Sequence, residues 1–183
     1  MAIWFVPYFS FIILFTGPRD LSLYPPKETS PWKLPWKGGV TRFVAQGNRS
    51  FTSHRAEHEG AWDFVMPIGT EVLAARGGQV IEVESNYDGI GYYANFVAIL
   101  HEDGTRSVYA HLKKDGVLVK TGEFVQQGQA IALSGMVGQA PGPHLHFYVT
   151  DKTGTKPVFI SFRDVPGNGI PLAAHFYESG NAN

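Results

Sequence analysis

The sequence predicts an all-β, mainly antiparallel domain. Short runs rich in β-branched and aromatic residues alternate with turn residues at a spacing that is typical of all-β domains. We find no amphipathic pattern long enough for a substantial helix, and no internal repeat. The chain has 183 residues, the usual size of one domain, so we expect a single core and a single site.

The expected strands cover residues 41–45, 71–74, 79–84, 96–101, 107–111, 130–134 and 144–150. The clearest pair is the hairpin FVAILHEDGTRSVYAHL, in which Asp103 and Gly104 tolerate positive φ. Because side chains alternate between the faces of a strand, we expect Tyr109 and His111 on one face and Ala110 on the other. Tyr109 would then line a cleft or fill the space beneath it.

The amino-terminal part of the sequence differs from the rest. Residues 1–16 are almost wholly apolar. A membrane span needs about 20 apolar residues, and this run is shorter. Its length suits the hydrophobic region of a signal peptide. We expect this segment to direct export or to anchor the chain, the alternative being an arm packed on the domain. Residues 17–33 are rich in proline and predict a linker or wrapping segment, and residues 34–183 the folded domain.

Composition narrows the chemistry that the chain can perform. A net charge of -1, from 15 basic and 16 acidic residues, gives no field that attracts polyanions, so no nucleic-acid partner is expected. The sequence contains no cysteine, which excludes disulfides, thiolate metal ligands and a cysteine nucleophile. Any transition metal must therefore be held by histidine, aspartate or glutamate.

The strongest candidate site combines two separated motifs. His144 and His146 lie two residues apart in GPHLHFYVT, a predicted strand, so both imidazoles face the same way and can converge on one ion. Upstream, SHRAEHEGAWDF supplies His54, His58 and Asp63. Two imidazoles and one carboxylate leave zinc a fourth position for water, as catalytic sites require. From the residues alone, solvated histidines with Asp63 capping a turn remain an alternative.

Three segments together, SHRAEHEGAWDFVMPIGTEVLAARGGQV, YAHL and GPHLHF, resemble the lysostaphin-type (LytM-like) zinc endopeptidases of bacterial cell wall. The resemblance implies a small two-sheet β domain with an open groove, like the barrel sandwich of duplicated-hybrid-motif proteins. It implies that His54, Asp63 and His146 hold Zn²⁺, while His111 and His144 assist water activation and stabilise the oxyanion. The implied substrate is a peptide crosslink or bridge of peptidoglycan, in the periplasm, the cell envelope or outside the cell.

The first metal ligand departs from the common family pattern. Many relatives place this histidine four residues before the aspartate, where the present chain has Glu59. The segment SHRAEHEGAWDF instead resembles a subset with a longer insert, in which His54 corresponds to the ligand of Asp63. We therefore expect His54 to bind the metal and His58 to be a loop histidine near the mouth of the cleft.

Other interpretations are open at this point. Some members of the resembled family have lost ligands and bind cell wall or activate other hydrolases, although this chain keeps the complete set. The segment GEFVQQGQAIALSG also resembles lipoyl and biotinyl carrier domains, but those need a Met-Lys pair that is missing here. Of the remaining histidines, His101 is expected to be exposed beside its hairpin turn, and His175 has no partner in the sequence.

Overall fold

The computed structural model of the protein describes residues 20–181, and the apolar segment predicted at 1–16 lies outside the described residues. The helical elements of the described part are short 3-10 turns: η1 (Leu21–Leu23), η2 (Lys27–Thr29) and η3 (Ala56–His58). Its strands are β1 (Thr41–Gln46), β2 (Trp62–Val65), β3 (Glu71–Leu73), β4 (Gly78–Glu84), β5 (Phe96–Leu100), β6 (Arg106–Ala110), β7 (Leu112–Val117), β8 (Phe124–Val125), β9 (Ala130–Ser134), β10 (His144–Thr150) and β11 (Phe176–Glu178).

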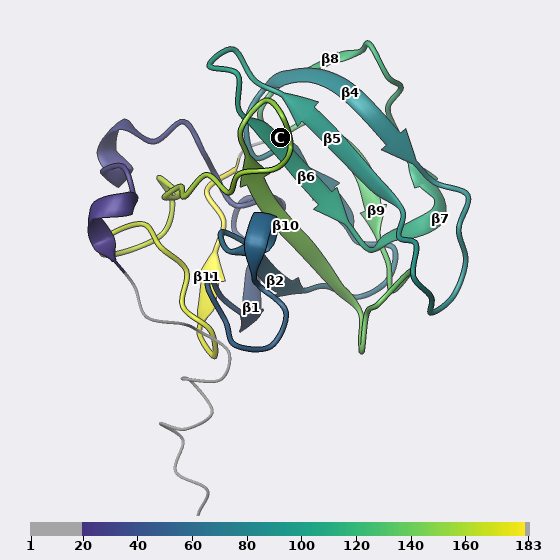
Figure 1. The fold of residues 1–183 in the computed structure, drawn as a ribbon, viewed down its shortest axis with the longest axis horizontal. Coiled ribbons are helices and arrows are strands. Elements are labelled where there is room, and N and C mark those ends of the chain that lie inside the picture. The colour runs from purple at the N-terminus through teal and green to yellow at the C-terminus, as the bar shows by residue number, and fades with distance from the viewer. Residues whose placement is uncertain (1–19, 182–183) are drawn as a thin grey trace, which may run out of the picture.

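The strands form two antiparallel sheets. The larger sheet has the order β11-β1-β2-β10-β6-β5-β4-β8 and the smaller one β3-β9-β7. Figure 1 shows β10 running across the molecule between β2 and β6, its partners in the ladder. The predicted all-β, mainly antiparallel, two-sheet fold is confirmed, and the strands of residues 20–181 form open sheets, not a closed barrel.

The strand boundaries show where sequence patterns are informative. β9 and β10 have the predicted bounds, and β1, β3, β4, β5 and β6 differ from them by a residue or so. β2, β7, β8 and β11 were not predicted. β8 and β11 have only two and three residues, and β7 reads LKKDGV, whose charged residues are exposed. β7, β8 and β11 form because of their neighbours in the sheet and not through a hydrophobic pattern of their own, whereas β2 alternates but has only four residues.

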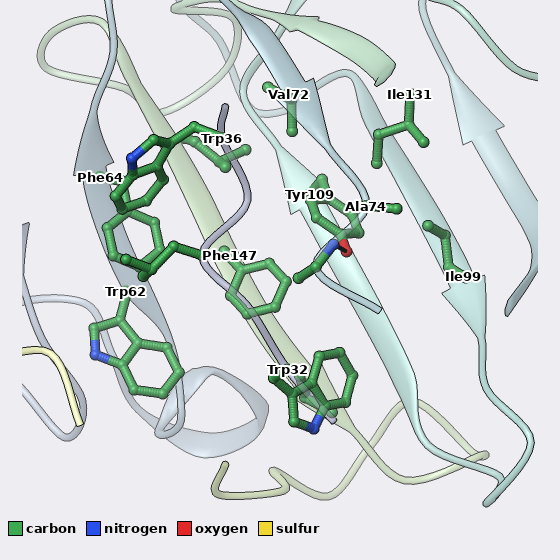
Figure 2. Packing of buried hydrophobic residues seen from close by; sticks show 14 of the residues in the cluster. Trp32, Trp36, Trp62, Phe64, Val72, Ala74, Ile99, Tyr109, Ile131 and Phe147 are labelled. Atoms are coloured by element: carbon green, nitrogen blue, oxygen red, sulfur yellow. Dashed lines mark hydrogen bonds between the residues drawn. The ribbon is translucent and has the colours of Figure 1, made fainter. Parts of the chain in front are cut away.

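Alternation along the strands places the core on one face of the larger sheet. On β10, Leu145, Phe147 and Val149 are fully buried, as are Trp62 and Phe64 on β2. The same core continues to the smaller sheet, where the buried cluster includes residues of β3 and β9 (Figure 2). Each large apolar side chain buried in this way contributes roughly 1.5–3 kcal/mol of transfer free energy.

The described part of the proline-rich segment also contributes to this core. Tyr24 and Trp32 are buried members of the cluster, and Trp32 packs edge-on against His101 with ring centroids 4.8 Å apart. Figure 2 shows Trp32 and Trp36 packed beside Phe147 and Phe64. None of the helices in residues 20–181 has the length and hydropathy of a membrane span.

His101 is buried, so the prediction that it is an exposed hairpin residue was wrong. Its side chain is only 3% exposed. Its Nδ1 donates to the carbonyl of Gly77 at 2.9 Å, and its Nε2 lies 2.9 Å from the Ser107 hydroxyl, which is also bonded to the Tyr109 hydroxyl. These partners satisfy both ring nitrogens, which removes the usual cost of burying a polar side chain. Burial lowers the pKa of His101 to about 4, against the opposing effect of the Gly77 carbonyl.

This buried histidine predicts an acid-sensitive stability. Because the unfolded chain protonates His101 below about pH 6.5 and the folded chain only near pH 4, acid favours unfolding between these values. From about pH 7 to about pH 5, His101 should lower the free energy of unfolding by about 2 kcal/mol. In His101→Gln, which keeps a donor and an acceptor, this part of the loss should disappear. Urea denaturation of the unmodified protein and of the variant at the two pH values measures the loss of unfolding free energy. An equal loss in both proteins would contradict the role of His101.

Candidate metal centre

The centre is built on the pairing of β2 with β10. Asp63 and His146 are directly opposite residues of this antiparallel ladder. Their neighbours Trp62, Phe64 and Phe147 enter the core, so alternation turns Asp63 and His146 to the opposite face. The His146 Nδ1 lies 2.8 Å from the Asp63 Oδ1.

His54 joins these two residues from the loop that follows β1. It is buried, and its Nδ1 donates to the carbonyl of Gly47 at 2.7 Å. This bond aims its Nε2 at Asp63, with 3.3 Å between Nε2 and Oδ1. One ligand atom from each of His54, Asp63 and His146 lies within 4.8 Å of the others. The structure therefore brings together the three residues that the sequence suggested as metal ligands.

His111 and His144 lie beside this cluster. Their ring centroids are 4.7 Å apart, and the His144 Nε2 is 3.6 Å from the Asp63 Oδ1. Each ring directs Nδ1 at a backbone carbonyl, His111 at Val137 and His144 at Gly142, both at 2.8 Å. Because a carbonyl only accepts, Nδ1 carries the hydrogen in both rings, and Nε2 of a neutral ring is free to accept.

The expectation that Tyr109 and His111 share one face of a strand was wrong. β6 ends at Ala110, and His111 has a left-handed backbone with φ 62°. This turn breaks the alternation, so Tyr109 fills the core beneath the site while Ala110 and His111 line the groove. A left-handed conformation costs a non-glycine residue of order 1 kcal/mol, which the surrounding contacts of His111 offset.

His58 lies closer to the centre than sequence reasoning indicated. It is at the end of η3 in the groove, and its Nδ1 is 3.2 Å from the Nε2 of His146. It therefore contacts the opposite side of the His146 ring from the nitrogen that faces Asp63. The sequence carried no signal for this contact, because it joins two segments that are far apart in the chain.

The electrostatics of the centre favour an ionised carboxylate among neutral imidazoles. Burial alone would raise the pKa of Asp63, but the neighbouring imidazoles of His146 and His54 outweigh this effect and hold that pKa well below its ordinary value. Burial lowers the pKa of His146, against the opposing effect of Asp63. Burial also lowers the pKa of His111, to about 4. At neutral pH these two imidazoles have lone pairs available for a metal ion or a proton.

The centre lies in an open groove of about 630 Å³ on the face of the larger sheet that points away from the core. Val108, Ala110 and Tyr148 also line the groove. Tyr92 and Tyr93 also line it, and are 81% and 61% exposed. Sequence reasoning missed this aromatic rim, although the segment YDGIGYYAN carries its residues.

The donor atoms of the centre fit a zinc ion. Because the Gly47 carbonyl holds the hydrogen of a neutral His54 on Nδ1, the Nε2 lone pair faces a carboxylate oxygen at 3.3 Å. Two acceptors this close repel unless a proton or a cation lies between them. Two imidazole nitrogens and one carboxylate oxygen are a common ligand set of catalytic zinc, with a fourth position left open.

Comparison with known families agrees with this geometry. The sequence profile described as Peptidase family M23 matches residues 56–158, more than half of the chain. The chain belongs to peptidase family M23. The matched stretch contains Asp63, His111, His144 and His146 and begins just after His54.

Individual members of the family are similar over the same region. Peptidoglycan DD-endopeptidase ShyA of Vibrio cholerae is 42% identical over 129 residues, which are 70% of this chain and 27% of that protein. Lysostaphin of Staphylococcus simulans is 42% identical over 87 residues, covering 46% of this chain and 16% of that protein. The crystal structure of a zinc containing peptidase from Vibrio cholerae has a TM-score of 0.54 and 31% identity, covering 70% of this chain and 39% of that one.

The resemblance to lysostaphin-type peptidases found in the sequence is therefore confirmed. The chain spans about a quarter of the length of ShyA, and a smaller part of lysostaphin. Because these relatives are much longer proteins, membership of family M23 establishes the family and the fold of this chain.

The geometry predicts one zinc ion per chain. Asp63→Asn and His54→Ala should weaken zinc binding by more than about 100-fold, since losing even a partner behind a ligand costs about 10–100-fold. Glu59→Gln is the matched control, because the Glu59 carboxylate faces Arg49 at 3.9 Å and does not line the groove. Metal analysis after equilibrium dialysis measures the occupancy. Zinc retained by His54→Ala and lost by Glu59→Gln would contradict the ligand set.

Proposed function

We propose that the protein is a zinc-dependent endopeptidase that hydrolyses peptide crosslinks or bridges in bacterial peptidoglycan. The observation that carries this proposal is the convergence of His54, Asp63 and His146, with donor atoms within 4.8 Å of one another, at the floor of an open groove. Membership of peptidase family M23 and the similarity to ShyA and lysostaphin support the same reaction class.

Three atoms of the chain would hold the ion: His54 Nε2, Asp63 Oδ1 and His146 Nδ1. Zinc, when bound, supplies Lewis-acid chemistry that polarises a carbonyl oxygen and lowers the pKa of water. The Gly47 carbonyl orients His54 from behind, as partners of metal-binding histidines do in many sites. The protein thus fixes both the identity and the direction of its donor atoms.

His111 and His144 would manage protons. A neutral His111 accepts a proton from the attacking water at Nε2, because its Nδ1 hydrogen is committed to Val137. Once protonated at Nε2, either ring can donate to the oxyanion that forms at the scissile carbonyl, or to the departing amine. The water oxygen adds to the carbonyl carbon, and the C–N bond then breaks. The two protons of the water end on the two products.

The groove suits an extended peptide better than a compact ligand. Polar side chains such as Asp63 and His144 line it, and so does the exposed rim of Tyr92 and Tyr93. Exposed aromatic side chains around a polar groove are typical of a binding surface. Peptidoglycan lies outside the cytoplasm, so we propose that the protein acts in the periplasm, in the cell envelope or outside the cell. The apolar residues 1–16 support export or anchoring.

Metal removal tests the proposed reaction directly. Treating the protein with a zinc chelator should abolish the release of soluble fragments from purified peptidoglycan, and zinc should restore it. Mass spectrometry of the fragments identifies the bond, because cleavage at a glycine bridge and at a D-amino-acid crosslink leaves different new amino termini. Release that is indifferent to metal would contradict the proposal. Binding to cell wall without release would indicate a non-catalytic module of the same fold.

His111 is predicted to act in catalysis and not in metal binding. His111→Asn tests this better than His111→Ala, because asparagine tolerates the left-handed backbone at this position. We expect zinc content to be unchanged and the rate to fall by roughly 10²–10⁴-fold, the usual contribution of a general base. Metal analysis and peptidoglycan release are measured on the same preparation. Loss of zinc comparable to that of His54→Ala would show that His111 is a ligand.

A further inference from the structure

His146 has a second contact that the proposed reaction does not use. Its Nδ1 faces Asp63 at 2.8 Å, and its Nε2 faces the Nδ1 of His58 at 3.2 Å. His58 is further held by Tyr148, whose ring it meets edge-on with centroids 4.6 Å apart. The two ring nitrogens of His146 therefore have different partners, one in the metal cluster and one in η3.

The direction that this hydrogen bond takes when zinc is bound follows from proton counting. A neutral imidazole carries one hydrogen, and the nitrogen that binds a metal ion cannot hold it. When Nδ1 of His146 is a ligand, its Nε2 must carry the hydrogen and act as a donor. The acceptor that the structure places within hydrogen-bond distance of this atom is the Nδ1 of His58.

Glu57 favours the form of His58 that accepts this bond. Its Oε1 lies 3.7 Å from the His58 Nε2, the nitrogen on the other side of the ring. A carboxylate near Nε2 attracts the hydrogen of a neutral imidazole to that atom, which leaves Nδ1 with its lone pair. The charge of Glu57 thus favours a His58 ring that accepts from His146.

We propose that His58 is a positioning residue, which accepts a hydrogen bond from His146 Nε2 and thereby holds that ring in the orientation and tautomer that bind zinc. This inference rests on the zinc site of the proposed function. Partners of this kind behind metal-binding histidines typically raise metal affinity by about 10–100-fold. His58 replaces no ligand, because it faces the nitrogen of His146 that points away from Asp63.

Zinc affinity separates the hydrogen bond from simple packing. His58→Phe keeps a ring against Tyr148 and removes the acceptor, so its zinc dissociation constant should rise by about 10-fold or more. His58→Asn loses the ring but places an oxygen near the position of Nδ1, so it should recover at least part of the affinity. His175→Phe is the matched control, because His175 is exposed and does not line the groove. Competition with a chromophoric zinc chelator gives the dissociation constants without any peptide substrate.

The outcomes distinguish this inference from the proposed function. If the unmodified chain binds no zinc, the proposed function fails. If it binds zinc and His58→Phe binds it equally tightly, the positioning role is overturned while the proposed function stands. If His58→Asn binds zinc no more tightly than His58→Phe, the hydrogen bond is not what His58 contributes. Circular dichroism of each variant establishes that it is folded, and His58→Asn alone still tests the role if His58→Phe does not fold.

Discussion

The cross-strand pairing of Asp63 on β2 with His146 on β10 is the interaction on which the rest of the centre depends. The two residues are opposite each other in an antiparallel ladder, where side chains lie about 4.5–5.5 Å apart at Cβ. The ladder keeps this register because Trp62, Phe64 and Phe147 fill the core behind it. A slip by one residue would turn Asp63 into the core and an aromatic side chain into the groove. Hydrophobic packing on one face therefore sets the geometry of the polar centre on the other.

The sequence was sufficient to predict those parts of the site that depend on strand alternation. The bounds of β10, and with them the shared direction of His144 and His146, follow from the pattern of apolar residues in GPHLHFYVT. Alternation failed at His111, because one residue with positive φ changes the face on which the side chain lies. It also gave no prediction of β2, which has four residues and forms because β1 and β10 pair with it.

The different environments of the histidines explain why residue type alone could not assign their roles. His54, His111 and His144 each direct Nδ1 at a backbone carbonyl, which leaves Nε2 free to bind a metal ion or accept a proton. His101 makes a similar bond to Gly77, but its Nε2 meets the Ser107 hydroxyl inside the core. These carbonyls and hydroxyls belong to residues that carry no motif, so only the folded chain separates a ligand from a structural histidine.

The balance of charge at the centre also has a chemical consequence. Asp63 is the one carboxylate within hydrogen-bond distance of His54 and His146 in the described part of the chain, and its low pKa keeps it ionised. Burial lowers the pKa of His146 and of His111, so these side chains add no charge at neutral pH. In the proposed zinc site, one carboxylate would neutralise only half the charge of the divalent cation, which would leave positive charge facing the groove where the proposed oxyanion forms. A second buried carboxylate would strengthen metal binding but cancel charge that could stabilise the transition state, and the proposed set of two imidazoles and one carboxylate would avoid this loss.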